Sequence, residues 1–166
     1  MRQSSLLQIL RKRQRGTDMK NVFIVYGAPG SGKSTFVKEH KAPDDLVIDL
    51  DYICAALMQE TEIYIPHDSV LRIARYMRDS VYPMIAMRAG EWNDCYIITS
   101  ESREIKINEL AMRLKATSTI LMDIPLEECL NRIENDNRRG KRREEYKQLA
   151  RGWYLQRNEA PPIRKK

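Results

Sequence analysis

One short segment constrains the fold of this 166-residue chain more than any other: an apolar run at residues 22–26 followed by GAPGSGKST at residues 27–35. The run VFIVY is typical of a buried strand. The glycines after it permit backbone angles that other residues avoid, so the chain can turn tightly there. Residues 34–40 continue in a pattern that favours a helix. The segment therefore predicts a strand, a glycine-rich loop and a helix in direct succession.

The loop fits the pattern G-x-x-x-x-G-K-[ST] without a mismatch, which chance gives in well under ~1% of chains this long. In such a loop successive backbone N–H groups form a concave nest for phosphate oxygens, and the helix N-terminus adds partial positive charge. We expect Lys33 to bridge the β and γ phosphates and the Ser34 hydroxyl to ligate Mg²⁺. A glycine-rich turn with an incidental lysine is the alternative. The residues predicted to hold a nucleoside triphosphate are Gly27, Ala28, Pro29, Gly30, Ser31, Gly32, Lys33, Ser34 and Thr35.

Strands and helices alternate along the rest of the chain. Strands separated by helices argue for an α/β fold, a parallel sheet with helices on both faces. The apolar run at residues 46–50 resembles strands that parallel sheets bury on both faces. Pro83 should kink or interrupt the long helix predicted at residues 67–89. Further strands are predicted at 46–50, 95–99 and 118–123, and helices at 34–40, 67–89, 104–114 and from Pro125 through a charged stretch to about 157.

The net charge of +6 resides at the two ends of the chain. Residues 1–20 contain six Lys or Arg and one Asp, and residues 161–166 contain three, which leaves −2 for residues 21–160. We therefore expect a basic N-terminal extension at 1–20, one domain at 21–160 and a basic C-terminal tail at 161–166. The basic ends could attract polyanions or be solvated extensions.

Apolar runs and cysteines indicate the compartment. The chain lacks the ~18 consecutive apolar residues of a membrane helix and a signal peptide, so we expect a cytoplasmic protein without a membrane partner. Cys54, Cys95 and Cys129 lie far apart in apolar contexts without metal-ligand spacing. We expect them to be reduced core thiols.

Two acids end the second predicted strand. Asp49 and Asp51 are two residues apart, so in a strand both would point to one face, at the carboxyl edge that borders the ligand crevice. We expect Asp51 to act as general base for an incoming hydroxyl and Asp49 to bind or orient the metal. The alternative is that Asp51 only caps the following helix.

A basic segment lies around residues 132–145, where six Lys or Arg oppose two acids within 132–143. Two helices joined at Gly140 would form a lid that brings arginines to the transferring phosphoryl group. A solvated charge run is the alternative. The candidate lid arginines are Arg132, Arg138 and Arg139.

These features resemble the small P-loop kinases, the group of polynucleotide 5′-kinases, zeta toxins and nucleoside monophosphate kinases. GAPGSGKST, the acids in DLD and the helix-lid-helix after ILMDIP carry the resemblance. The chain is more similar still to short bacteriophage and prophage ATP-binding proteins, called AAA-family ATPases or kinases, in which GAPGSGKST, DLVIDLD and a terminal WY helix recur. Over residues 21–157 the resemblance implies a three-layer P-loop NTPase fold of four to five strands, order 2-3-1-4, with a helical lid, ATP and Mg²⁺.

The sequence departs from these relatives at two places. Polynucleotide kinases have an arginine soon after the acid pair, whereas residues 53–55 are ICA here. Ring-forming motors require an apolar strand that ends in Asp-Glu, whereas Asp123 is followed by Ile124 here. The first departure weakens the prediction that the acceptor is a nucleic-acid end, and the second argues against a ring-forming motor.

Two functions fit the sequence. The first is an ATP-dependent kinase that transfers the γ-phosphate to a nucleotide, a nucleic-acid end or a small molecule, with Asp51 as base and Lys33 and the lid arginines as electrostatic stabilisers. The second is a nucleotide-binding ATPase that serves as an accessory factor in DNA metabolism or packaging, without an acceptor. Arg75, Arg78 and Arg103 could hold an acceptor phosphate or pair with nearby acids. The acceptor and the oligomeric state are left open.

Overall fold

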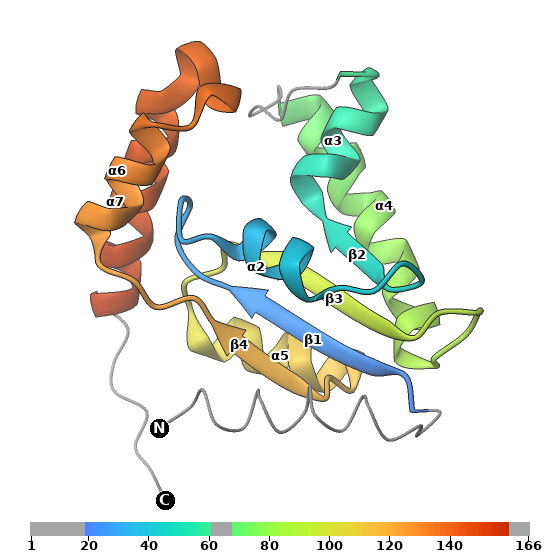
Figure 1. Ribbon diagram of the computed structural model, residues 1–166. Helices are drawn as coiled ribbons and strands as arrows, with labels where there is room; N and C mark the ends of the chain where they lie inside the picture. The colour runs from blue at the N-terminus through green and yellow to red at the C-terminus, as the bar shows by residue number, and fades with distance from the viewer. Residues whose placement is uncertain (1–18, 61–67, 160–166) are drawn as a thin grey trace, which may run out of the picture.

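The computed structural model describes residues 19–60 and 68–159, which form a parallel sheet with helices on both faces (Figure 1). The sheet has four strands in the order β2-β3-β1-β4. This is the order that the resemblance implied, and the part of the chain described here contains no fifth strand. The strands are β1 (Asn21–Tyr26), β2 (Leu46–Asp49), β3 (Asp94–Thr99) and β4 (Ser118–Leu121).

Alternation along β1 divides the core into two parts. Val22 and Ile24 pack with apolar side chains of helices α4 (Asp68–Ala86) and α5 (Glu104–Leu114) on one face of the sheet. Phe23 and Val25 pack with Val37 of helix α2 (Lys33–His40) on the other face. Because successive side chains of a strand point to opposite faces, a continuous apolar run fits a central strand that is covered twice. The predicted three layers are therefore confirmed.

The helices lie close to their predicted positions. Of the kink or interruption expected at Pro83, the interruption does not occur, because the long helix continues through the exposed Pro83 to Ala86. A proline this close to a helix C-terminus removes one backbone donor from the last turns, and here its ring faces solvent. His67, where this helix was expected to begin, lies outside the described residues. The helices are α2 (Lys33–His40), α3 (Leu50–Met58), α4 (Asp68–Ala86), α5 (Glu104–Leu114), α6 (Leu126–Glu134), the 3-10 helix η2 (Asn137–Arg142) and α7 (Arg143–Glu159).

The position of β2 differs from the expectation of a strand buried on both faces. Among the described strands, β2 lies at the edge of the sheet and pairs with β3 alone, and Leu46 is 36% exposed. An apolar run shows that a strand faces a core, but the strand order decides how many neighbours cover it.

The three cysteines are buried and free, as predicted. Burial raises the pKa of the Cys95 thiol to about 12, so that group is not a thiolate near neutral pH. In the described parts of the chain, no helix is both long and apolar enough to cross a membrane.

Two pairs of helices stand on either side of the glycine-rich loop that follows β1 (Figure 1). α3 and α4 lie on one side, and α6 and α7 lie on the other. The carboxyl ends of the four parallel strands point toward this region. The fold thus places the loop between these two pairs of helices.

Candidate nucleotide-binding site

The loop between β1 and α2 has the backbone that its sequence predicts. Gly30 has φ of 81° and Gly32 has φ of 92°, values in the left-handed region that favours glycine. A Cβ atom at Gly30 would lie 2.7 Å from the carbonyl oxygen of Cys129 in α6. Glycine is therefore required at position 30 for two reasons, the backbone angle and the close approach of α6.

Lys33 is the first residue of α2, and its side chain is 8% exposed. Its Nζ donates hydrogen bonds to the carbonyl oxygens of Gly27 at 2.9 Å and Ala28 at 2.8 Å. These contacts hold the ammonium group within the turn of the loop. A buried positive charge at the N-terminus of a helix is suited to a polyphosphate.

Ser34 and Asp49 are joined across the carboxyl end of the sheet. The Ser34 Oγ donates to Asp49 Oδ2 at 3.3 Å, and Asp49 is 7% exposed. Hydroxyl and carboxylate oxygens are ligands that Mg²⁺ accepts. The described residues contain no group of three or more His, Cys, Asp or Glu side chains that could hold a metal ion.

The structure corrects the geometry that the sequence suggested for Asp49 and Asp51. Asp49 ends β2, but Asp51 lies in the first turn of α3, so the two do not share a strand face. Asp49, rather than Asp51, is the N-cap, because its Oδ1 accepts a hydrogen bond from the Asp51 backbone N–H at 3.1 Å. Helix α3 begins at Leu50, so the strand conformation that was expected to include Asp51 ends at Asp49. Asp51 is exposed in the first turn of the helix.

The environment of Asp49 shifts its acidity strongly. Burial raises the pKa of Asp49 to about 6, and the negative charge of Asp51 adds to this shift. Hydrogen bonds from the Asp51 backbone and Ser34, together with the Lys33 charge, act in the opposite direction. A buried carboxyl with a raised pKa gains from a nearby cation, which supports the metal-side assignment.

Arg132 is the one predicted lid arginine whose side chain the structure describes. Its Nη1 donates to the Ser31 carbonyl oxygen at 3.3 Å, and its Nη2 pairs with Glu128. The guanidinium group of α6 therefore lies against the loop. Arg138 and Arg139 belong to η2, where Gly140 with φ of 46° interrupts the helical path, but their side chains lie outside the described part.

The loop forms the floor of a cleft of about 1130 Å³. One wall comes from α3 and α4 and carries charged side chains, including Asp51, Arg75 and Arg78. The opposite wall comes from α6 and α7. It includes Arg132, Tyr146, Leu149, Gly152, Trp153 and Gln156.

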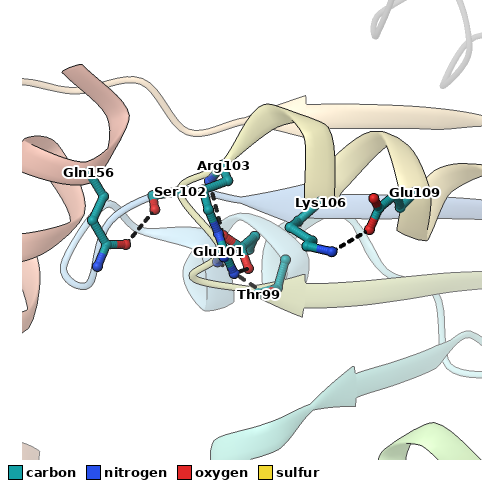
Figure 2. Close-up of polar contacts among 7 residues, drawn as sticks. All are labelled: Thr99, Glu101, Ser102, Arg103, Lys106, Glu109 and Gln156. Atoms are coloured by element: carbon teal, nitrogen blue, oxygen red, sulfur yellow. Dashed lines mark hydrogen bonds and ion pairs between the residues drawn. The ribbon is translucent and has the colours of Figure 1, made fainter. Parts of the chain in front are cut away.

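The arginines that sequence analysis left open have different partners. Arg78 pairs with Asp79 at 2.8 Å, and Arg103 pairs with Glu101, as Figure 2 shows for the second pair. Arg75 lines the cleft and makes no hydrogen bond or ion pair with any described residue. Pairing with a nearby acid, one of the two alternatives for each arginine, is therefore found for Arg78 and Arg103, whereas no described acid pairs with Arg75.

The wall formed by α7 was not predicted. Trp153 is buried against Ala28 and Cys129, and Leu149, Gly152 and Gln156 on the same helix line the cleft. Gln156 Oε1 accepts a hydrogen bond from Ser102 Oγ at 2.8 Å, which joins α7 to the segment after β3 (Figure 2). No sequence signal marks these residues, because only the packing of α7 brings them beside the loop.

The parallel sheet in the order β2-β3-β1-β4 and the glycine-rich loop after β1 together define a P-loop fold. A family model described as an AAA domain matches residues 22–161. The chain therefore belongs to this AAA-domain family. A comparison with curated protein sequences found no match.

Solved structures support the fold assignment. A chain in a structure of the Pnkp1/Rnl/Hen1 RNA repair complex is 17% identical with a TM-score of 0.58, covering 87% of this chain and 48% of that chain. A shikimate kinase from Acinetobacter baumannii in complex with shikimate is 17% identical with a TM-score of 0.52, covering 85% of this chain and 78% of the kinase. A second Pnkp1/Rnl/Hen1 structure is 23% identical with a TM-score of 0.50, covering 70% and 40%. This chain thus spans about half, or less, of the RNA repair chains that it matches.

Proposed function

We propose that the chain is a Mg²⁺-dependent phosphotransferase that moves the γ-phosphate of ATP to a hydroxyl or phosphate group of an acceptor. The observation that carries the proposal is the convergence of Lys33, Ser34, Asp49 and Asp51 at one edge of the sheet. A binding module would need only the loop. Two acids beside the loop, one buried and one exposed at the cleft, support chemistry at the end of the triphosphate.

Ser34 and Asp49 would hold the Mg²⁺ ion, which supplies charge neutralisation at the phosphates. The protein residues have separate roles around that site. Lys33 would neutralise the phosphate oxygens, and Arg132, which already contacts the loop, would approach the same charge from α6. Arg138 and Arg139 remain proposals for the same role.

In the transfer step an acceptor oxygen attacks the γ-phosphorus, and the bond from that phosphorus to the β–γ bridging oxygen breaks. ADP leaves with the electron pair of the broken bond. When the acceptor is a hydroxyl, Asp51 accepts its proton. The position of Asp51 supports this role, because it is exposed, lines the cleft and is held near Asp49 by the turn that starts α3.

The α4 wall supports an acceptor that carries negative charge. Arg75 and Arg78 line the cleft from one helix, and the Arg75 charge also acts on Cys54 of α3, near the acids. Arg75 thus offers a cation on the side where the acceptor must lie, although no arginine follows the acid pair in sequence. This cation could pair with the negative charge of a nucleotide, a nucleic-acid end or an acidic small molecule.

The test incubates the protein with labelled ATP and Mg²⁺ against nucleic-acid 5′ ends, nucleotides, nucleosides and acidic small molecules. We expect label on one anionic class. Asp51→Asn should lower transfer by about 10²–10⁴-fold and leave ATP affinity unchanged, because it removes only the base. Asp44→Asn, an exposed acid outside the cleft, is the matched control. Unchanged turnover in Asp51→Asn would disprove the assigned base.

The alternative is a nucleotide-binding ATPase that acts as an accessory factor. It predicts slow hydrolysis and no labelled acceptor in the same assay. We further propose the domain limits 21–160, with a lid at 132–145 and basic ends at 1–20 and 161–166; the family match over residues 22–161 supports the main limits. Salt-sensitive DNA binding that is lost on removal of residues 1–18 would favour the accessory role.

A further inference from the structure

We propose that helix α4 pairs with α4 of a second copy of this chain, antiparallel, across a two-fold axis at Ser80. The surface that carries this inference is the α4 stripe, a row of exposed apolar side chains along the helix. The inference does not depend on the proposed function, because the stripe lies outside the cleft. The members of the α4 stripe, which are 46% to 82% exposed, are Ile73, Tyr76, Met77, Met84 and Met87.

The spacing of these side chains gathers them on one face of the helix. Residues three, four or seven positions apart are neighbours on a helix surface, and the stripe follows these intervals. The Met87 N–H donates to the Pro83 carbonyl oxygen at 3.0 Å, so the helical path reaches the last member although α4 ends at Ala86. Tyr82 and Ile85, which face the core from the same helix, are buried. The stripe is therefore distinct from the face that holds α4 on the sheet.

The extent of the stripe sets it apart from ordinary surface residues. Single exposed apolar side chains are common on proteins and need no partner. Here they form a row from Ile73 to Met87, a length of about 21 Å along one helix. Leu71, Arg75 and Arg78 of α4 line the cleft, and no member of the stripe does. A continuous apolar row away from the ligand site is typical of a surface that another protein surface covers.

The order of side-chain sizes along the stripe favours a second copy as that partner. Two large apolar residues, Ile73 and Met77, precede Ser80, and two more, Met84 and Met87, follow it. An antiparallel pair centred on Ser80 places Ile73 opposite Met87 of the second copy. The same pairing places Met77 opposite Met84 of the second copy. A two-fold interface requires a surface that is complementary to itself, and this row meets that requirement.

Ser80 suits the point where the two helices meet. Its short side chain permits a close approach, and its Oγ donates to the Met77 carbonyl oxygen at 2.7 Å. The hydroxyl donor thus keeps its partner when the second copy excludes water. Ile73, Ser80 and Met87 are spaced by seven residues, as are Met77 and Met84. A seven-residue repeat keeps two helices in contact over several turns when they cross at about 20°.

The size of the contact determines how tight the dimer is. Two helices about 10 Å wide that meet along about 21 Å bury less surface than the roughly 1,600 Å² of a standard interface. The stripe contains no charged residue, so its burial removes no ion from water. We therefore expect a reversible dimer with a dissociation constant on the order of micromolar.

The test measures the oligomeric state of the full chain by sedimentation velocity over about 1–100 μM, a range that spans the expected dissociation constant. The wild type should shift from monomer to dimer. Ser80→Arg and Ser80→Glu each bring two like charges together on the axis, so each should weaken dimerisation roughly 100-fold. An equimolar mixture of the two variants should restore dimers, because opposite charges then meet. Only a residue that contacts its own copy gives this rescue.

A matched control and a second variant accompany the Ser80 pair. Met112→Arg places the same charge on α5, where Met112 is 73% exposed, and should dimerise like the wild type. Met84→Glu covers the case in which the Ser80 variants fail to fold, because it charges the stripe one turn away from the axis. It should also weaken dimerisation. Thermal melts monitored by circular dichroism establish that each variant is folded.

Three results would overturn the inference. A wild type that stays monomeric throughout the series would do so, and a dimer that forms only after removal of residues 1–18 would identify the chain's own N-terminal segment as the occupant. A wild-type dimer that persists in folded Ser80→Arg and Met84→Glu would place the interface on another face. Two monomeric Ser80 variants whose mixture stays monomeric would remove the axis from Ser80.

Discussion

Substitution of Gly30 by alanine tests how the loop and α6 depend on each other. The new Cβ would lie 2.7 Å from the Cys129 carbonyl oxygen and 2.9 Å from Ile133 Cγ1, and the residue would keep φ of 81°. The left-handed backbone costs roughly 1–2 kcal/mol for a residue other than glycine. Overpacking against backbone and a buried side chain adds about 1–3 kcal/mol. We therefore expect the free energy of unfolding to fall by about 2–5 kcal/mol.

Two other glycines separate these contributions. Gly140 has φ of 46° and ψ of −130° but open space around it, so Gly140→Ala should show only a backbone cost of about 1–3 kcal/mol. Gly152 has neither a positive φ nor a close neighbour, so Gly152→Ala should raise the free energy of unfolding by about 0.5–1 kcal/mol.

Urea unfolding monitored by circular dichroism measures all three variants. The expected order of stability is Gly152→Ala above wild type, then Gly140→Ala, then Gly30→Ala. If Gly30→Ala is no less stable than Gly140→Ala, the close contact between the loop and α6 does not exist in solution. The assignment of Arg132 to the phosphates would then lose its support, since the same helix brings it to the loop.

Two further predictions concern single side chains of the cleft. The pKa of Asp49 is raised from 3.8 to about 6, so the folded state retains the proton and the free energy of unfolding falls as pH rises from about 4 to about 6. The Asp49→Asn variant keeps the N-cap and serves as the reference. Between about pH 4 and about pH 6 the free energy of unfolding of the wild type, measured in urea, should fall by about 3 kcal/mol relative to this variant. A difference between the two proteins that does not change with pH would contradict the burial of this carboxyl. Arg75→Ala should raise KM for the anionic acceptor about 10–100-fold with little change in KM for ATP, because a charged hydrogen bond is lost. Arg72→Ala, an exposed arginine of α4 outside the cleft, should behave as wild type in the same steady-state assay, and equal effects of the two variants would refute an acceptor role for Arg75.

The loop and most of the strands and helices could be predicted because their determinants are local. The nine residues from Gly27 to Thr35 are contiguous, and a strand before them and a helix after them follow from neighbouring side chains. The segment at 104–114 was predicted as a helix with the bounds that the structure shows. Hydrophobic periodicity and the residue preferences of turns depend on a few neighbouring residues, so both can be recognised without knowledge of the rest of the chain.

Other features depended on where segments meet. The exposed edge of β2 follows from the strand order, which no residue of β2 encodes. The capping role of Asp49 follows from the point at which α3 begins, a boundary that shifted by about one residue from the expected end of the strand.

The sequence by itself determined that the chain has a P-loop motif in an α/β domain and placed two acids at the end of the second strand. The tertiary structure alone decided that Arg75 on α4 and Gly152 on α7 border opposite walls of one cleft. These residues are far apart in the sequence, and each gains its neighbours only when its helix packs beside the loop. A local pattern can specify a conformation, whereas a binding wall requires long-range packing that fixes distances between separate helices.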